Sequence, residues 1–313
     1  MQKELISEFN EILPFAEKGD AEAQYRLGTI YSCSKEVIDD KETFKWFHKA
    51  AKQGHVQAMF RLGDLYGFGR KGIEKDSQEA FKWYHKVAEQ GDPWAQDTLG
   101  LMYRRGEGVP QDIEKSLKWS IKAAEQGKPL IQYGLAEAFF LGESGFPQDF
   151  KEAAKWFHKA ADRGEKLAQY RLGEIYYNGN GFEQDYEEAA KWFRKLAEWG
   201  DAEAQFYLGT MYYNGEGMSQ DYQKAAKWYR KAAEQEDTKS QLLLVEIYHK
   251  GNGVAKDCVE AYKWALIAEK NGQDVSKFKP SLEKKMEAKQ IAKSKKMAKR
   301  FIPKTTWPEK LGI

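Results

Sequence analysis

The residue types that usually carry catalysis or bind metal ions are few in this sequence and lie far apart. They are the histidines His48, His55, His85, His158 and His249, and the cysteines Cys33 and Cys258. Metal ligands converge through short spacings such as H-E-x-x-H or closely spaced cysteines, and the sequence contains neither. It also lacks a nucleophile-elbow serine. We therefore predict no catalytic residue, no metal site and no cofactor.

Glycine pairs recur along the chain and are the remaining candidates for a chemical site. Gly179-Asn180-Gly181 and Gly215-Glu216-Gly217 are two examples. A phosphate-binding loop combines such glycines with a lysine and a preceding strand, and both are missing here. Because glycine also ends helices in the left-handed conformation, we expect these loops to be helix caps.

A tryptophan recurs with nearly constant spacing, and this period predicts the elements that position every other residue. The seven tryptophans, separated by 36 or 37 residues, are Trp46, Trp83, Trp119, Trp156, Trp192, Trp228 and Trp264. A fixed period of this length indicates one unit copied end to end, stacked into a solenoid. With 8 Pro, 42% hydrophobic residues and no alternating apolar pattern, the chain reads as folded and all-α.

The unit at residues 202–235 predicts two helices. Ala204, Leu208 and Met211 share one face at the spacing of an amphipathic helix. Gly215 ends this first helix, and Asp221 is placed to cap the second.

The interiors of both helices predict close packing. Gly209 lies inside the first helix, where glycine costs roughly 1 kcal/mol relative to alanine, so we expect another helix to approach it. The second helix carries two apolar strips around Trp228 and therefore has two neighbours. We expect the tryptophan to fill the space that the glycine leaves.

The motif A-x-A-Q-x-x-L-G-x-x-Y-x-x-G-x-G, followed by Asp and by A-x-x-W-x-x-K-A-A-E-x-G, resembles the Sel-1-like repeat of the tetratricopeptide superfamily. The resemblance covers residues 21–272. It implies an α/α solenoid with a right-handed superhelix, in which the first helix of each repeat lines a concave groove. Members of this family act mainly as adaptors that gather other proteins, in bacterial host interaction and signalling and in eukaryotic protein quality control.

Three regions follow from the repeats. Residues 1–20 are predicted to form a capping helix, and residues 273–313 to form closing helices and a basic tail. The seven repeats are expected at about 21–54, 55–91, 92–127, 128–164, 165–200, 201–236 and 237–272. Repeat one has Ser32 to Glu36 in place of the glycine loop. Repeat four opens with Lys128-Pro129, and repeat seven has Val245 at the glycine position. At these last two places we expect helices to spread or tilt.

The variable residues of the first helices predict where a partner binds. Two residues before the repeat leucine stand Tyr25, Phe60, Asp97, Tyr133, Tyr170, Phe206 and Leu242, of which five are aromatic. Tyrosines and spaced carboxylates suit a peptide that carries basic and apolar side chains. The predicted partner-binding residues are Tyr133, Phe140, Tyr170, Glu174, Tyr177, Phe206 and Tyr213. Alternatively, these aromatic residues only pack between neighbouring first helices.

The C-terminal segment is the second candidate surface. Residues 277–313 carry 12 Lys or Arg and 3 Glu, so the other 276 residues carry a net charge of −7. A basic segment can contact nucleic acid or an anionic membrane. Equally, it can be the solvated face of a capping helix, since Met286, Ile291, Met297 and Phe301 interleave with the lysines. His48, His85 and His158 occupy positions where Arg194 and Arg230 stand in later repeats, which predicts an exposed helix face.

Three functions compete at this stage. The first is a non-enzymatic scaffold or adaptor that binds proteins or peptides, with no small-molecule substrate. The second is β-lactam binding or hydrolysis, linked to a cysteine-rich branch of the family whose cysteine pairs this chain lacks. The third is tethering to membrane or nucleic acid through the basic tail. The polar start of the chain, from Met1 to Glu8, predicts no secretory segment and favours a cytoplasmic location.

Overall fold

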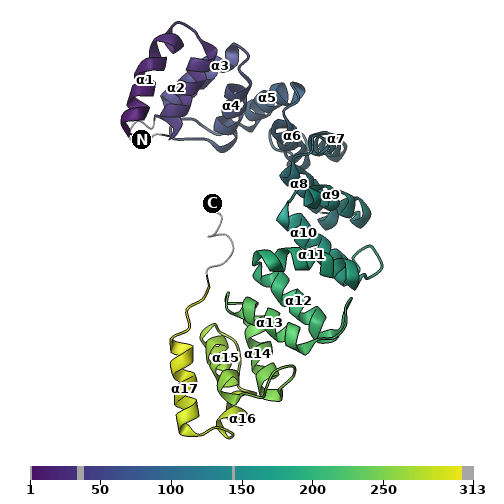
Figure 1. Ribbon diagram of the computed structural model, residues 1–313. Coiled ribbons are helices and arrows are strands. Elements are labelled where there is room, and N and C mark those ends of the chain that lie inside the picture. Colours follow the sequence, from purple (N-terminus) through teal and green to yellow (C-terminus); the bar gives the residue numbers. More distant parts are fainter. Residues whose placement is uncertain (1, 34–38, 143–144, 305–313) are drawn as a thin grey trace. The chain divides into compact units, whose positions relative to one another are not determined.

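The protein is built from α-helices. The computed structural model describes residues 2–33, 39–142 and 145–304, and these residues form seventeen helices and no β-strand (Figure 1). The turn expected at Ser32 to Glu36 and the tail around Pro308 fall largely or wholly outside the described residues. The chain divides into two compact units, residues 1–163 and 164–313.

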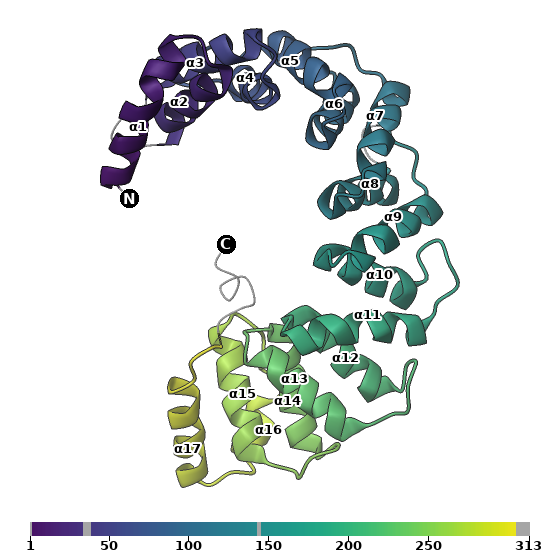
Figure 2. The same ribbon diagram turned by 45° about the horizontal axis from the view of Figure 1, so that its top comes forward.

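The first unit contains nine helices. They are α1 (Gln2–Glu17), α2 (Ala21–Cys33), α3 (Asp40–Lys52), α4 (Val56–Phe68), α5 (Ser77–Glu89), α6 (Pro93–Arg105), α7 (Ile113–Glu125), α8 (Pro129–Leu141) and α9 (Phe150–Asp162). Each helix packs against the next one along the chain. Within this unit α2, α4, α6 and α8 lie along one side, and α3, α5, α7 and α9 lie along the other (Figure 2).

The second unit continues the same alternation. Its helices are α10 (Lys166–Asn178), α11 (Tyr186–Trp199), α12 (Ala202–Asn214), α13 (Tyr222–Ala233), α14 (Thr238–Lys250), α15 (Cys258–Lys270), α16 (Lys279–Glu283) and α17 (Ala288–Lys299). In both units the even-numbered helices up to α14 are the first helices of the repeats, and the odd-numbered helices from α3 to α15 are the second.

Aspartate and glycine set the ends of the helices. At every odd-numbered helix from α3 to α15 an aspartate side chain accepts hydrogen bonds from the first free backbone N–H groups, as predicted for Asp221. Gly215 ends α12 at φ 76°, and its N–H donates to the Met211 carbonyl over 2.9 Å. The first glycine of the pair is therefore the expected helix cap.

The second glycine of the pair has a different role. Gly217, at φ 65°, lies against the start of α11 in the preceding repeat. A Cβ atom there would lie 2.6 Å from the backbone nitrogen of Glu187 and still closer to the Tyr186 carbonyl. Gly108 and Gly253 meet the start of α5 and of α13 in the same way. Our expectation that these loops are only helix caps was thus incomplete, because the second glycine also lets successive repeats stack.

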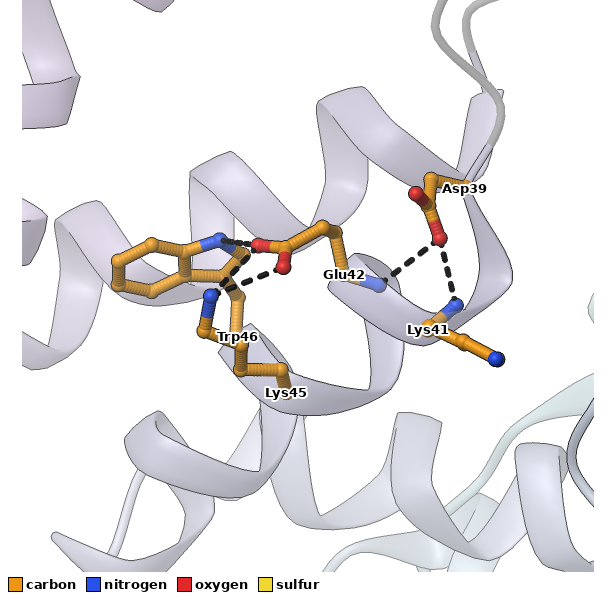
Figure 3. A network of polar contacts seen from close by, with 5 residues as sticks. All are labelled: Asp39, Lys41, Glu42, Lys45 and Trp46. Atoms are coloured by element: carbon orange, nitrogen blue, oxygen red, sulfur yellow. Dashed lines mark hydrogen bonds and ion pairs between the residues drawn. The ribbon is translucent and has the colours of Figure 1, made fainter.

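The repeat tryptophan contacts a lysine of its own helix, and in repeat one its indole N–H is also hydrogen-bonded. In α3, Asp39 caps the backbone N–H groups of Lys41 and Glu42, and Glu42 accepts from the Trp46 indole N–H over 2.9 Å and from Lys45 (Figure 3). In each of the first six repeats the lysine three residues after the tryptophan covers its ring, with Nζ 3.8 to 5.0 Å from the centroid.

The helix glycine makes room for the residue after the tryptophan, so our expectation that the tryptophan fills this space was wrong. A Cβ on Gly209 would lie 2.8 Å from the Tyr229 ring, and a Cβ on Gly173 would lie 2.6 Å from the Phe193 ring. In repeat seven the sizes are exchanged: Val245 replaces the glycine and Ala265 the aromatic residue, and both are fully buried in one cluster. The exchange keeps the two positions complementary in size.

In most repeats a buried glutamine links the first helix to the end of the preceding helix. Gln205 of α12 donates to the Ala197 carbonyl at the end of α11 in the preceding repeat, and its own oxygen accepts from Gln235, which follows α13 in the same repeat, both over 3.0 Å. The same donor bond is made by Gln24, Gln96, Gln132 and Gln241. In repeat two Met59 takes this position, and the Gln90 amide meets its sulfur at 3.8 Å.

The two ends of the repeats are covered by helices. Ile12 and Ala16 of α1 are buried in one cluster with Leu27 and Trp46. After α15, Leu282 and Met286 are buried against the last repeat. Such caps cover apolar surface that the terminal repeats would otherwise expose.

Candidate functional site

Three of the predicted partner-binding residues meet around one tyrosine in the second unit. The rings of Tyr170, Tyr177 and Phe206 lie 6.2, 5.4 and 5.6 Å from the ring of Tyr207, edge to face. Tyr207 itself stacks on Phe193 at 4.6 Å. All of these rings except the buried Phe193 are half-buried. The predicted residues therefore form one aromatic layer across α10 and α12.

The hydroxyl groups of this layer are bound by the following repeat. Tyr177 donates to Glu216 over 2.9 Å, and Tyr170 is hydrogen-bonded to Glu203. Burial, together with these carboxylates, raises the pKa of both tyrosines above the ordinary value, so both stay neutral. These side chains lie on the predicted helices. Much of their surface packs between neighbouring first helices, which was the alternative interpretation of the sequence.

The remaining predicted residues of this unit, Glu174 and Tyr213, contact other side chains. Glu174 of α10 pairs with Arg171 over 2.9 Å. Tyr213 packs edge to face on Tyr222 at 5.1 Å, and its hydroxyl accepts from the Asn252 amide over 3.3 Å.

Tyr133 and Phe140 belong to the first unit. Both lie on α8 and contact Phe157 of α9, with ring centroids 5.8 and 6.2 Å apart. Phe140 also meets the ring of Phe150 at 5.3 Å. Their partners are thus on the second helix of their own repeat.

A cavity of about 470 Å³ lies on the even-numbered helices of the first unit. Its walls include Tyr25 from α2, Phe60 and Arg61 from α4, and Trp94 and Asp97 from α6. The Tyr25 ring is held by stacking on His55 at 4.6 Å, and the Phe60 ring packs on Tyr84 at 5.4 Å. Cavities of this size bind small molecules or single side chains.

Asp97 is the unusual residue of this cavity. Within the described part of the chain, no hydrogen bond or ion pair reaches its carboxylate. Burial raises its pKa from 3.8 to about 6, although the positive charge of Arg104 acts in the opposite direction. Nearby Asp64, by contrast, accepts from the Tyr84 hydroxyl over 2.8 Å and pairs with Arg61 at 3.4 Å.

Exposed apolar side chains mark the same set of helices. Trp94 of α6 and Leu130 of α8 hold equivalent positions in the first turn of their helices and are 42% and 52% exposed. Leu167 of α10 holds the same position in the second unit, with 54% exposure. Neither Trp94 nor Asp97 is among the partner-binding residues predicted from the sequence. Two features of the sequence could have identified them. Trp94 does not belong to the regularly spaced tryptophans, and Asp97 stands at a position that is aromatic in five of the seven repeats.

The histidines are less exposed than we predicted. His48 packs edge to face on Trp83 at 6.4 Å, and His85 on Trp119 at 5.9 Å, so each contacts the tryptophan of the next repeat. Burial lowers the pKa of His48. Among the described residues, no three His, Cys, Asp or Glu side chains converge as a metal site would require. Both cysteines are free thiols.

The basic C-terminal segment packs on the last repeat. The Ser294 hydroxyl of α17 donates to the Val259 carbonyl over 2.9 Å, and Phe301 meets the Trp264 ring at 5.7 Å. Lys304 pairs with Glu234. The lysines Lys289, Lys293, Lys295 and Lys296 stay exposed. In the described ranges, no helix combines the length and apolar character needed to cross a bilayer.

Comparison with known proteins agrees with this architecture. The Sel1 repeat model matches residues 21–55, 56–92, 95–128, 130–165, 166–201, 202–237 and 239–273. A protective antigen of uropathogenic Escherichia coli that displays the SLR fold is 32% identical, covers 97% of this chain and 74% of its own, and has a TM-score of 0.54. A Sel1 repeat protein from Oxalobacter formigenes is 30% identical over 79% of this chain and 99% of its own, with a TM-score of 0.62. No curated protein matches the chain. With seven matched repeats and these relatives, the chain belongs to the Sel1 repeat family.

Proposed function

We propose that the protein is a non-enzymatic adaptor that binds partner proteins or peptides on its even-numbered helices. Sel1 repeats generally form scaffolds for protein interactions. The observation that carries the proposal is the pair of exposed apolar side chains Trp94 and Leu130, at equivalent positions on α6 and α8 of the first unit; Leu167 holds the same position on α10 of the second unit. A partner that covers these side chains would bury apolar surface, which favours binding.

The aromatic layer of the second unit offers a binding surface with polar groups on its own even-numbered helices. Tyr170, Tyr177 and Phe206 are half-buried and present ring edges between carboxylates, a combination that suits a peptide with basic and apolar side chains. The predicted residues Tyr133, Phe140, Glu174 and Tyr213 remain part of this proposal. A role in bacterial signalling or host interaction is the setting that we favour, because both similar structures come from bacteria.

The two alternative functions have weaker support. The β-lactam hypothesis relied on a branch with a cysteine pair in each repeat, and Cys33 and Cys258 are single free thiols in the first and last repeats. The tethering hypothesis relied on an unoccupied basic tail, and α17 instead uses Ile291, Ser294 and Ala298 to pack on the body.

Site-specific photocrosslinking tests the adaptor proposal. A photoreactive residue is placed at Trp94, Leu130 or Leu167 on the even-numbered helices, and at the exposed Lys118 or Lys155 on α7 and α9 as matched controls. Crosslinking in the native cell extract should give discrete adducts from the first set and not from the second. Equal labelling of both sets, or adducts only from the controls, would contradict the proposal.

A further inference from the structure

The cavity on α2, α4 and α6 combines aromatic walls with a carboxylate. Tyr25, Phe60 and Trp94 supply the walls, and Asp97 supplies the charge. Aromatic faces attract cations, and guanidinium groups stack on them more readily than ammonium groups. A carboxylate beside such faces completes a receptor for a planar cation, since the cation can stack and donate hydrogen bonds at the same time.

The charges around the cavity favour a positive occupant. Asp92 and Asp97 line it together with Arg61, and Arg61 pairs with Asp64 at 3.4 Å. Asp92 caps α6 by accepting from the Ala95 N–H over 2.8 Å. Arg61 pairs with Asp64, so it does not neutralise Asp97. The positive charge of Arg104 on α6 lowers the pKa of Asp97 without a hydrogen bond between them. Asp97 is thus the acidic group without a partner.

We infer that this cavity binds an arginine side chain of the partner segment, with the guanidinium group between the aromatic walls and the carboxylate of Asp97. The inference rests on the proposed adaptor function and deepens it, because it assigns one side chain of the partner to one cavity. Asp97 is half-buried and lines the cavity, so a cation bound there would pair with a carboxylate that is already partly removed from water.

A capped amino acid tests the cavity directly. N-acetylarginine methylamide is titrated into the full chain, and the indole N–H resonance of Trp94 is followed by NMR after its assignment from the Trp94→Phe variant. We expect a saturable shift with the arginine compound and none with its citrulline counterpart, which has the same shape without the charge. Asp97→Asn should weaken arginine binding at least tenfold, and the exposed control Asp162→Asn should leave it unchanged.

Two results would overturn the inference. Equal shifts with the citrulline compound would show that the cavity does not distinguish a charged side chain from a neutral one. Unchanged arginine binding in the Asp97→Asn variant would show that this carboxylate does not bind the guanidinium group. A circular dichroism spectrum of each variant confirms that it is folded, and Phe60→Leu provides a second variant that reduces an aromatic wall.

A peptide selection separates this inference from the proposed function. A random peptide display library is selected on the wild type and on Asp97→Asn. Arginine at one fixed position in the wild-type pool, and its loss in the variant pool, supports the inference. Enriched peptides without that preference overturn it while the adaptor function stands. If no peptide is enriched, the adaptor proposal fails. The titration with the arginine compound then shows by itself whether the cavity binds an arginine side chain.

Discussion

The substitution Asp97→Asn should stabilise the protein at neutral pH, which is the opposite of what most substitutions at buried polar residues do. Burial raises the pKa of the Asp97 carboxyl from 3.8 to about 6. A tenfold change in proton affinity is worth about 1.4 kcal/mol, so the ionised carboxylate costs the folded state about 3 kcal/mol. Asparagine has a similar shape, stays neutral and avoids this cost.

The sign of the pH dependence follows from the same pKa. Below about pH 3.8 the carboxyl is protonated in both states, and the two proteins should be equally stable. Between pH 3.8 and about 6 the folded protein holds a proton that the unfolded chain has released. The free energy of unfolding of the wild type should therefore fall across this interval relative to the variant, and the full difference should be present above about pH 7.

Thermal melting at several pH values measures this difference. At pH 8 the variant should melt several degrees above the wild type, because 1 kcal/mol corresponds to roughly 2–4 °C in a unit of this size. At pH 3 the difference should nearly vanish. Asp162→Asn, which changes an exposed carboxylate of the same unit, should show neither effect. A variant less stable than the wild type at pH 8, or a difference independent of pH, would refute the reasoning.

Three further predictions concern the contacts between helices. Gly217→Ala should lower the urea unfolding free energy by at least about 1 kcal/mol more than Gly200→Ala: both glycines have positive φ, but only Gly217 has backbone within reach of an added Cβ. Gly209→Val and Tyr229→Ala should each lower the free energy of unfolding by about 2–5 kcal/mol. The double variant should lose about 1–3 kcal/mol less than the sum of the two single losses, because the larger residue fills the space that the smaller one leaves. Additive losses would argue against size complementarity. Gln205→Ala removes two ladder hydrogen bonds and should speed amide hydrogen exchange at the end of α11 by roughly tenfold or more; unchanged exchange would contradict a linking role.

Much of the fold was predictable from the sequence because the same pattern of tryptophan, aspartate and glycine recurs along the chain. The period placed the helices, and the aspartate and glycine positions placed their ends. The contact of Gly209 with Tyr229, instead of with the adjacent Trp228, was not predictable in the same way. Two neighbouring aromatic residues of one helix point about 100° apart, and sequence spacing alone does not say which of them faces the glycine.

The candidate surface was predicted less well, for a physical reason. Tyr170 and Tyr177 stand at positions that vary between repeats, which suggests recognition, but the next repeat supplies Glu203 and Glu216 to their hydroxyls. Such a partner lies 33 to 39 residues away in sequence, and its identity depends on how repeats stack. The cavity at Asp97 arises in the same way, from side chains of three successive first helices.

The glutamine ladder implies that the repeats are not equally coupled in energy. A solenoid behaves as a one-dimensional array in which stability is the sum of unit terms and nearest-neighbour terms. In five repeats the glutamine donates to the end of the preceding helix, as Gln205 does to the Ala197 carbonyl, but Met59 of repeat two has no such donor and only meets the Gln90 amide at 3.8 Å. That position lies within the helices that form the cavity. This position therefore lacks a polar link that other repeats have, and a segment bound against α2, α4 and α6 would connect three repeats across it.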